Sequence, residues 1–452
     1  MEKLISKYFI PGKTFWLADY EKDGGYQAAR TVFESRTREA VIEEVKKSNL
    51  RGLGGAGFPT GMKWSFVPQN TGKPVYLVVN ADEGEPGTFK DKYILVHAPH
   101  LLLEGIIIAA FANNVHKAFV YIRGEYALAA EVMEKAIEEA RAKGYVGEKC
   151  FGKDYELEVV VHRGAGAYIC GEETGLLESL EGKRAYPRLK PPFPAVVGLF
   201  ASPTVINNVE TLACIPYILN RGAEWYAKLG SDKNGGMRLL CVSGHVKKPG
   251  IYELPLGIKL RDVIFEHAGG IINDRKLKAV VPGGLSAAIL TADEIDVGMD
   301  FDQLRALNTM AGSGGVIVMD ETTSMVEALL VTMRFYAHES CGQCSPCREG
   351  TGWVYKILNR VVAGEGRKED IDKLLDICSF LGGTTICALA DGAAMPLRSY
   401  PTKFRAEFED YIAQKKSNPY IRSRLFHHAS STKRGGEREY VELGDRLSSL
   451  SP

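Results

Sequence analysis

The sequence has no net charge and no long hydrophobic run. Its 56 basic and 56 acidic residues balance over 452 positions, so no overall electric field favours a nucleic acid or an anionic membrane surface. The most apolar stretch, residues 101–112, contains a glutamate and a glycine and falls well short of the ~20 residues that a membrane span needs. Residues 1–11 lack the apolar core and cleavage site of a secretory signal. We therefore expect a cytoplasmic protein without membrane insertion.

Cysteine is also infrequent, with nine residues in the chain. An odd number in so long a sequence fits metal-bound and buried thiols in a reducing compartment better than a disulfide framework. The length suggests about three domains, and 45% hydrophobic with 25% charged residues is typical of a globular protein. A substantial core is therefore expected.

Several of these cysteines form a CxxCxxC run at residues 341–347. Thiolates this close can hold three corners of a cubic iron–sulfur cluster. For the fourth corner we favour Cys387, which follows a pair of glycines, over Cys378, which lies in an apolar helical pattern. Structural zinc is the alternative, but zinc ligands usually come as two separated pairs, so the spacing favours iron and sulfur.

A glycine-rich stretch at residues 51–64 formally satisfies GxGxxG through Gly52, Gly54 and Gly57. That dinucleotide fingerprint should follow a strand, yet a charged helical pattern precedes this one. We interpret the stretch as a loop whose bare backbone approaches a flat or phosphorylated ligand, with Lys63 near enough to meet a phosphate. A surface turn is the alternative interpretation.

Strand and helix patterns then alternate, which predicts a βαβαβ unit with a parallel sheet. The strand patterns cover residues 75–79, 117–122 and 157–161, and the helical patterns cover 99–112 and 126–143. The first strand ends in Asn80, Asp82, Glu83 and Glu85, at the edge where open α/β sheets bind ligands. Their carboxylates and amide could bind sugar or ribityl hydroxyls, or a metal. A solvated acidic turn without a ligand fits the same residues equally well.

A second glycine-rich loop, residues 163–171, leads into Glu172 and Glu173 at the predicted start of a helix. Carboxylates suit the positive end of a helix dipole but would repel a phosphate there. We therefore expect them to accept hydrogen bonds from sugar hydroxyls or an amide. Lys190 and Phe193 lie in a rigid proline-rich segment that suits a pocket wall.

The second half of the chain predicts two further modules. Short strand patterns at residues 239–243, 250–254 and 279–282, with a helical pattern at 260–267, indicate a small ubiquitin-like α+β fold. Helical patterns at 322–338, 352–362, 371–381 and 398–414 indicate four helices with the cysteine loop between the first two. For the polar residues 417–452 we expect disorder, an unusual extension or a cloning-derived segment, and the adjacent histidines 427 and 428 are too weak a signal for a metal site.

The motifs, taken in order over about residues 1–415, carry a family resemblance. They are residues 51–64, 80–87, 171–173, 203–211 and 339–350. Together they resemble the flavin-bearing, NADH-oxidising subunit of respiratory complex I, the 51-kDa or F-type subunit. Diaphorase subunits of NAD-reducing hydrogenases and NAD-dependent formate dehydrogenases are the nearest competitors.

The resemblance implies a fold, its cofactors and its site residues. The implied fold is a Rossmann-like α/β domain for FMN and NADH (1–235), a β-grasp domain of the soluble-ligand-binding type (236–330), a four-helix bundle with one 4Fe-4S cluster (331–416), and the polar tail (417–452). FMN would contact Gly52, Gly54, Lys63, Asn80, Asp82, Glu83, Gly171, Glu172, Glu173, Ile206, Asn207 and Asn208. NADH would contact Phe58, Phe66, Glu85, Tyr168, Glu173, Lys190 and Phe193, and the cluster would be held by Cys341, Cys344, Cys347 and Cys387. Leu53 stands where the family usually has arginine, so no anion contact from that side chain is expected.

The implied reaction is a direct hydride transfer from NADH to FMN, followed by single-electron transfer to the cluster. No general acid or base is obligatory, and Glu85 and Glu173 assist positioning. The implied partners are a small 2Fe-2S thioredoxin-like subunit and a large multi-cluster subunit, leading to a quinone-reducing membrane complex on its cytoplasmic side, with no nucleic acid. A zinc-stabilised nucleotide-binding scaffold without redox chemistry is the alternative from another class.

Overall fold

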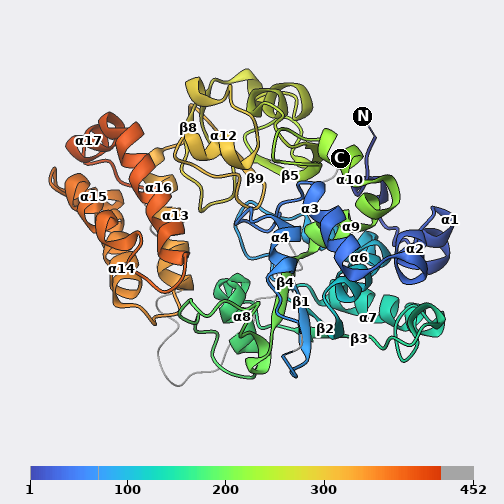
Figure 1. The fold of residues 1–452 in the computed structure, drawn as a ribbon. Coiled ribbons are helices and arrows are strands. Elements are labelled where there is room, and N and C mark those ends of the chain that lie inside the picture. The colour runs from blue at the N-terminus through green and yellow to red at the C-terminus, as the bar shows by residue number, and fades with distance from the viewer. Residues whose placement is uncertain (1, 70, 419–452) are drawn as a thin grey trace, which may run out of the picture.

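The computed structural model describes residues 2–69 and 71–418. The predicted polar tail from residue 419 onward, with its two histidines, lies outside the described residues. Figure 1 shows two sheets in the middle of the molecule, with the helices α13 to α17 at one end and α1 and α2 at the other.

The first sheet has four parallel strands in the order β3-β2-β1-β4. The strands are β1 (Val75–Ala81), β2 (Val115–Ile122), β3 (Glu158–Arg163) and β4 (Thr204–Asn208). The predicted βαβαβ unit is therefore confirmed for β1 to β3. The sequence did not reveal β4, because its short apolar run leads directly into a helix.

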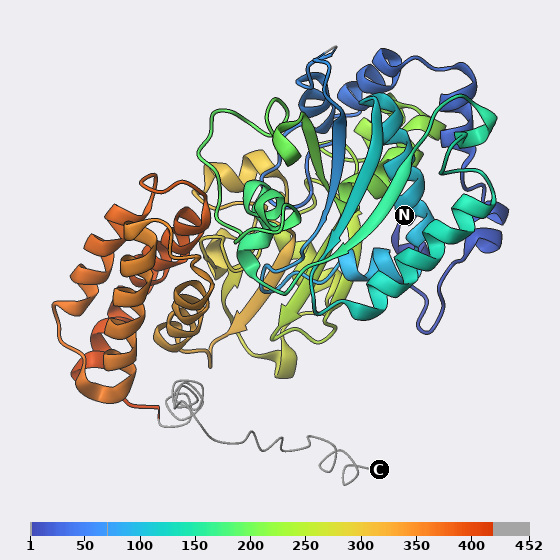
Figure 2. The same cartoon turned by 90° about the horizontal axis from the view of Figure 1, so that it is seen from below.

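Helices cover both faces of this sheet. The α5 (Asp91–His97), α6 (Pro99–Ala112), α7 (Ala127–Ala142) and α9 (Val209–Arg221) helices lie on one face, and α8 (Glu173–Leu180) lies on the other, between the sheet and the C-terminal helices (Figures 1 and 2). The α6 helix is buried almost all round, which explains why the most apolar stretch of the chain is found there. Within the described residues no single helix is long and apolar enough to cross a membrane; α5 and α6 reach that composition only as a pair bent by 102°.

The N-terminal helices are fastened to α6 by one buried carboxylate. Glu104 accepts hydrogen bonds from the Tyr20 hydroxyl at 2.5 Å and from the backbone N–H groups of Tyr26 and Ala29 at 2.9 and 3.0 Å. Burial raises the pKa of Glu104, and these donors oppose the rise. The helices of this region are α1 (Leu17–Lys22), α2 (Gln27–Ser35), α3 (Arg38–Lys47), α4 (Thr60–Ser65) and α10 (Ala223–Lys228).

The second sheet has five strands in the order β6-β5-β9-β7-β8. Its strands are β5 (Met237–Gly244), β6 (Gly250–Pro255), β7 (Leu277–Val281), β8 (Leu290–Thr291) and β9 (Gly315–Asp320). Only β5 and β9 run parallel. With α11 (Leu260–Asp262), the π-helical turn Val263–His267 and α12 (Phe301–Ala306), this region is the small α+β module that the sequence predicted.

The C-terminal helices differ in detail from the predicted four. They are α13 (Met325–Glu339), α14 (Ser345–Arg360), α15 (Asp370–Leu381), α16 (Leu389–Lys403) and α17 (Arg405–Ala413). The prediction missed most of α16, because Pro396 and Pro401 inside it resemble helix breakers. It also began α14 too late: Pro346 lies in the first helical turn, where its missing N–H costs nothing. The cysteine run is therefore partly helical.

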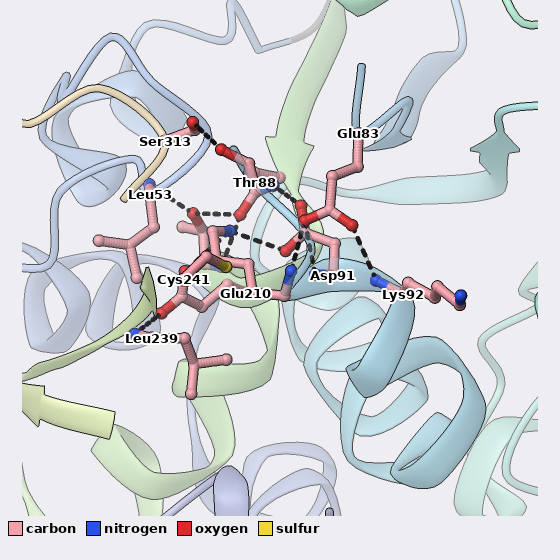
Figure 3. Close-up of polar contacts among 12 residues, drawn as sticks. Leu53, Glu83, Thr88, Asp91, Lys92, Glu210, Leu239, Cys241 and Ser313 are labelled. Atoms are coloured by element: carbon pink, nitrogen blue, oxygen red, sulfur yellow. Dashed lines mark hydrogen bonds and ion pairs between the residues drawn. The ribbon is translucent and has the colours of Figure 1, made fainter. Parts of the chain in front are cut away.

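A buried lysine joins the α5, α9 and β5 elements. Lys90 Nζ lies 2.8 Å from both an Asp91 and a Glu210 carboxylate oxygen, and Glu210 also accepts the Leu239 N–H at 2.6 Å. Figure 3 shows Asp91, Glu210 and Leu239 together in this interior. Burial alone would lower the pKa of Lys90, but the negative charges of Asp91 and Glu210 outweigh this effect. The pKa of Lys90 is therefore raised.

We predict that Lys90→Met destabilises the chain by about 3–5 kcal/mol, because two buried carboxylates lose their cation. Urea denaturation of the purified protein measures this change. Lys92→Met, which removes an exposed charge two positions away, serves as the control and should change the free energy of unfolding by less than about 0.5 kcal/mol. Equal losses in the two variants would contradict the assignment.

Candidate functional site

The carboxyl ends of β1 and β4 form the centre of the site. The two strands are parallel neighbours, with Val79 opposite Asn207 and Asn80 opposite Asn208. From β1 the chain continues through α5 and α6 to β2 on one side, whereas β4 pairs on the other side. Open α/β sheets bind ligands where strand order reverses in this way. The crevice between β1 and β4 is thus the expected ligand position.

The glycine loop of residues 52–57 lies against this crevice. A Cβ atom on Gly54 would lie only 2.9 Å from Asn208 Cβ, so glycine is required there, and the backbone N–H of Leu53 donates to Thr211 Oγ1 at 2.9 Å. A Cβ atom on Gly55 would meet nothing within 4 Å, so the loop presents bare backbone on an open side. The Leu53 side chain is fully buried, so it points into the protein rather than toward a ligand.

The second glycine segment approaches the same edge from the other side. Asn80 Nδ2 donates to the Gly171 carbonyl at 2.8 Å, and a Cβ atom on Gly171 would lie 3.3 Å from the Asp82 carbonyl oxygen. The following residue, Glu172, is the N-cap of α8 and accepts the backbone N–H groups of Thr174 and Gly175 at 2.8 Å. The predicted position of Glu172 at a helix start is confirmed.

Two lysines lie beside the crevice, and they differ in their ion-pair partners. Lys190 Nζ lies 3.0 Å from carboxylate oxygens of both Glu172 and Glu173. Lys63 Nζ donates to the Ile206 carbonyl at 3.1 Å, and no carboxylate within residues 2–69 and 71–418 forms an ion pair with it. Burial lowers the pKa of Lys63. The Lys63 ammonium would therefore be stabilised by an anionic group of a ligand.

The asparagine side chains of β4 are occupied within the protein. Asn207 Oδ1 accepts the Trp64 Nε1–H at 2.9 Å, while Asn208 Nδ2 donates to Asp91 Oδ2 at 2.6 Å. Asn208 Oδ1 also accepts the Thr211 N–H at 3.3 Å, as the N-cap of α9. These bonds fix the glycine loop, α4 and α9 around the crevice, and the predicted FMN contacts of both residues stay predictions.

The carboxylates of Asp82 and Glu83 have opposite surroundings. Asp82 Oδ2 is buried and has no hydrogen-bond partner among the described residues, and burial raises the pKa of Asp82 to about 7. Glu83 instead accepts the backbone N–H groups of Lys90, Asp91 and Lys92 at 2.7, 2.8 and 3.1 Å, and Figure 3 shows it above the start of α5. Burial, with Asp91, raises the pKa of Glu83 to about 7. Its side chain holds α5, which leaves Asp82 to meet a ligand.

Glu85 belongs to a buried network that joins all three parts of the fold. Its carboxylate accepts the Tyr168 hydroxyl at 2.7 Å and the Ser286 N–H and hydroxyl at 2.7 and 3.0 Å. Ser286 Oγ lies 2.6 Å from the hydroxyl of Tyr336 on α13. The backbone N–H of Tyr168 donates to Glu339 at 3.1 Å, two residues before the first cysteine of the run. The residues that follow the carboxyl end of β1 are thus linked to the cysteine loop.

Three predicted aromatic residues are exposed at the surface. The Phe58 and Phe66 ring centroids are 6.0 Å apart, and the side chains of Phe58, Phe66 and Phe193 are 41%, 54% and 58% exposed. Exposed rings of this size suit stacking against a flat base.

The cysteines meet where α13, α14 and α16 approach one another. Cys344 is the N-cap of α14, Cys347 lies in its first turn, and Cys387 precedes α16. The backbone N–H of Ile386, the residue before Cys387, donates to Cys344 Sγ at 3.4 Å, which brings Cys387 next to the cysteine run. Burial raises the pKa of Cys387 to about 11. Cys378 instead lies buried between helices, with its Sγ 3.3 Å from the Ala394 carbonyl.

The distances between these thiols distinguish a site for a single metal ion from a site for an iron–sulfur cluster. Within the described part of the chain, no three His, Cys, Asp or Glu side chains gather closely enough to share one metal ion. The ligands of a cubic cluster each bind a different iron, so they need not converge on one point.

The residues fit a flat, phosphorylated and hydroxylated ligand beside an iron–sulfur centre. The unpartnered Asp82 oxygen is an acceptor for a hydroxyl, Lys63 is a cation for a phosphate, and the glycine loop offers bare backbone to a ring. Sequence reasoning assigned no role to Ser286, Tyr336 or Glu339. Of these only Glu339 carried a signal, as the first residue of the 339–350 motif.

Comparison with known proteins gives matches over most of the chain. Residues 45–217 match the Nuo51 FMN-binding domain, residues 238–318 the SLBB domain, and residues 327–411 the NADH-ubiquinone oxidoreductase-F iron-sulfur binding region. The second F-type NADH-quinone oxidoreductase protein of Rhizobium meliloti is 56% identical over 400 residues, which are 88% of this chain and 95% of the relative. The F-type NADH-quinone oxidoreductase protein of Rickettsia felis is 50% identical over 397 residues, 88% of this chain and 94% of the relative.

Solved structures give a similar result. A chain of the NAD+-reducing [NiFe]-hydrogenase in the air-oxidized state is similar with a TM-score of 0.77 and 37% identity, over 85% of this chain and 65% of that chain. In the H2-reduced state the TM-score is 0.78 at 35% identity, over 92% of this chain and 71% of that chain.

We predict that Cys387→Ala abolishes retention of a 4Fe-4S cluster, because one iron loses its protein ligand, whereas Cys378→Ala retains it. Iron and sulfide content of the anaerobically purified variants measures this difference. Cys378→Ala is the matched control, since it removes a buried thiol from the same helical region. The reverse pattern would contradict the choice of the fourth ligand.

Proposed function

The chain belongs to the family of F-type subunits of NADH-quinone oxidoreductases, and from this premise we propose which residues bind each group. The protein is an FMN-dependent NADH dehydrogenase subunit with one 4Fe-4S cluster. The hydrogenase, formate dehydrogenase and zinc-scaffold alternatives are not favoured. When bound, FMN supplies the ability to accept a hydride from NADH and to release its electrons singly.

The FMN site lies in the crevice between β1 and β4, and the unpartnered carboxylate oxygen of Asp82 supports this proposal most directly. Asp82 accepts a ribityl hydroxyl, Lys63 contacts the phosphate, and the backbone of Gly52 and Gly54 adjoins the ring. The remaining proposed contacts are Asn80, Glu83, Gly171, Glu172, Glu173, Ile206, Asn207 and Asn208. For Glu83 we propose a backbone contact, because its carboxylate already holds α5.

The NADH site adjoins the open side of the glycine loop. The exposed rings of Phe58, Phe66 and Phe193 hold the adenine, while Lys190 is free to exchange one of its two carboxylate partners for an NADH group. Glu85, Tyr168 and Glu173 contact the sugars or the nicotinamide. The network through Ser286 orients Glu85 and Tyr168 before NADH binds, so these residues position the substrate and none acts as an obligatory acid or base.

The cluster is held by Cys341, Cys344, Cys347 and Cys387. Their loops are fixed by the surrounding helices and by the link from Tyr168 to Glu339, which sets the position of the cluster relative to the nucleotide site. The predicted limits at residues 1–235, 236–330 and 331–416 would divide α13, which begins at Met325. We therefore propose limits at residues 1–235, 236–324 and 325–416, with a tail over 417–452.

As a component of an oxidoreductase complex, the chain works with partner subunits. We propose that these are a small 2Fe-2S thioredoxin-like subunit and a large multi-cluster iron–sulfur subunit, with the chain peripheral on the cytoplasmic side of the membrane that holds the quinone-reducing part.

The proposed function is tested by the absorbance of the anaerobically purified chain before and after NADH is added. We expect flavin bands over a broad iron–sulfur shoulder, and bleaching of the flavin bands within the mixing time, because bound NADH reduces FMN without a slow chemical step. A colourless zinc protein that stays colourless after reconstitution with FMN and iron would overturn the proposal.

We predict that the affinity of the apoprotein for FMN falls about tenfold between pH 8 and pH 6. The free carboxyl of Asp82 has a pKa of about 7, and a hydroxyl donated to its charged form lowers that pKa in the complex. Below pH 7 binding must therefore expel a proton, which weakens it. Quenching of FMN fluorescence measures the affinity at each pH.

Asp82→Asn removes the titrating group and should flatten this component of the pH dependence, while the exposed Asp154→Asn should leave it unchanged. The phosphate of FMN titrates in both proteins. The difference between their slopes of FMN affinity against pH therefore gives the contribution of Asp82 alone. Identical slopes in the two proteins would exclude Asp82 as the hydroxyl acceptor.

A further inference from the structure

Ser340 lies between the last residue of α13 and the first cysteine of the run. Its backbone N–H continues the helix by donating to the Tyr336 carbonyl at 3.0 Å. Its hydroxyl oxygen lies 3.2 Å from Cys347 Sγ and also accepts the backbone N–H of Gly342 at 3.4 Å. The hydroxyl is therefore fixed within the loop and aimed at one particular thiol.

The direction of this hydrogen bond follows from the chemistry of a ligand thiolate. A cysteine bound to iron has lost its proton and can only accept. The serine oxygen already accepts from Gly342, and its own proton is the only one available between the two atoms. In the loaded protein the Ser340 hydroxyl must therefore donate to Cys347 Sγ.

We propose that the Ser340 hydroxyl tunes the 4Fe-4S cluster by donating to the Cys347 thiolate, which raises the reduction potential of the cluster. This inference rests on the proposed ligand set. One added electron increases the negative charge on the cluster and its thiolates, so a fixed donor stabilises the reduced state more than the oxidised state. Ser340 is a positioning and tuning residue, since it acts on iron through Cys347.

The Ser340 hydroxyl should affect its thiolate more strongly than the other donors near the cysteine run, because Cys347 is buried. Cys347 is buried, whereas Cys341 and Cys344 are partly exposed, so water is poorly placed to replace the hydroxyl at Cys347. Cys344 also has a donor, the Ile386 N–H at 3.4 Å, but that group belongs to the backbone. Ser345, the first residue of α14, accepts from Arg348 instead, at 3.3 Å.

The test is a redox titration of the loaded chain, followed by electron paramagnetic resonance of the reduced cluster. For Ser340→Ala we expect a lower midpoint potential, with iron content per chain and FMN potential unchanged. The expected change in the equilibrium constant of electron acceptance is about three- to tenfold, which is ~30–60 mV for a one-electron couple. Ser340→Thr retains the hydroxyl and should restore the wild-type potential.

Ser345→Ala is the matched control, because it removes a hydroxyl between Cys344 and Cys347 that accepts from Arg348. An unchanged potential in Ser340→Ala, or an equal shift in Ser345→Ala, would overturn the inference. If the wild-type chain binds no cluster, the proposed ligand set fails instead, so the two failures are distinguishable.

A second measurement on the wild-type protein keeps the test decisive if Ser340→Ala does not load iron. Pulsed electron–nuclear double resonance of the reduced cluster should show a coupled proton that is lost after brief exposure to D2O, since a hydroxyl exchanges faster than a buried amide. Ser345→Ala should retain this signal, and its absence from the wild-type protein would contradict the hydrogen bond.

Discussion

The parallel pairing of β1 with β4 is the constraint on which the site depends. Because the two strands run in the same direction and in register, their polar carboxyl ends meet at one edge of the sheet. The glycine loop then has to fit against Asn208 with no side chain at Gly54, and Gly171 has to approach Asp82 from the other side. Segments far apart in the sequence are thus forced to a common crevice.

The site is built largely from charges that burial would otherwise penalise. Glu83, Lys90 and Glu210 are each compensated by several donors or by an opposite charge, as buried ions require. Asp82 Oδ2, by contrast, has no hydrogen-bond partner among the described residues. A buried acceptor without a donor costs free energy, and a donor that reaches it recovers that cost.

One hydrogen-bonded network joins Glu85, after the carboxyl end of β1, to the cysteine loop. Tyr168 is held at its hydroxyl by Glu85 and at its backbone by Glu339, and Glu339 is followed directly by the loop that contains Ser340 and Cys341. Tyr168, bound at both ends, together with Ser286 and Tyr336, therefore connects three parts of the fold through hydrogen bonds.

The sequence by itself determined the local chemistry of this protein. The spacing of Cys341, Cys344 and Cys347 indicated an iron–sulfur centre, the alternating patterns predicted β1 to β3, and the glycine loop with Lys63 indicated a phosphorylated ligand, because each of these signals resides in neighbouring residues. The tertiary structure decided what no local pattern contains. It made residues 204–208 a strand beside β1 and brought Ser286 to Glu85. It also turned the Glu83 carboxylate to α5 and left Asp82 Oδ2 without a hydrogen-bond partner among the described residues. These outcomes depend on how the whole chain folds, which no local pattern contains.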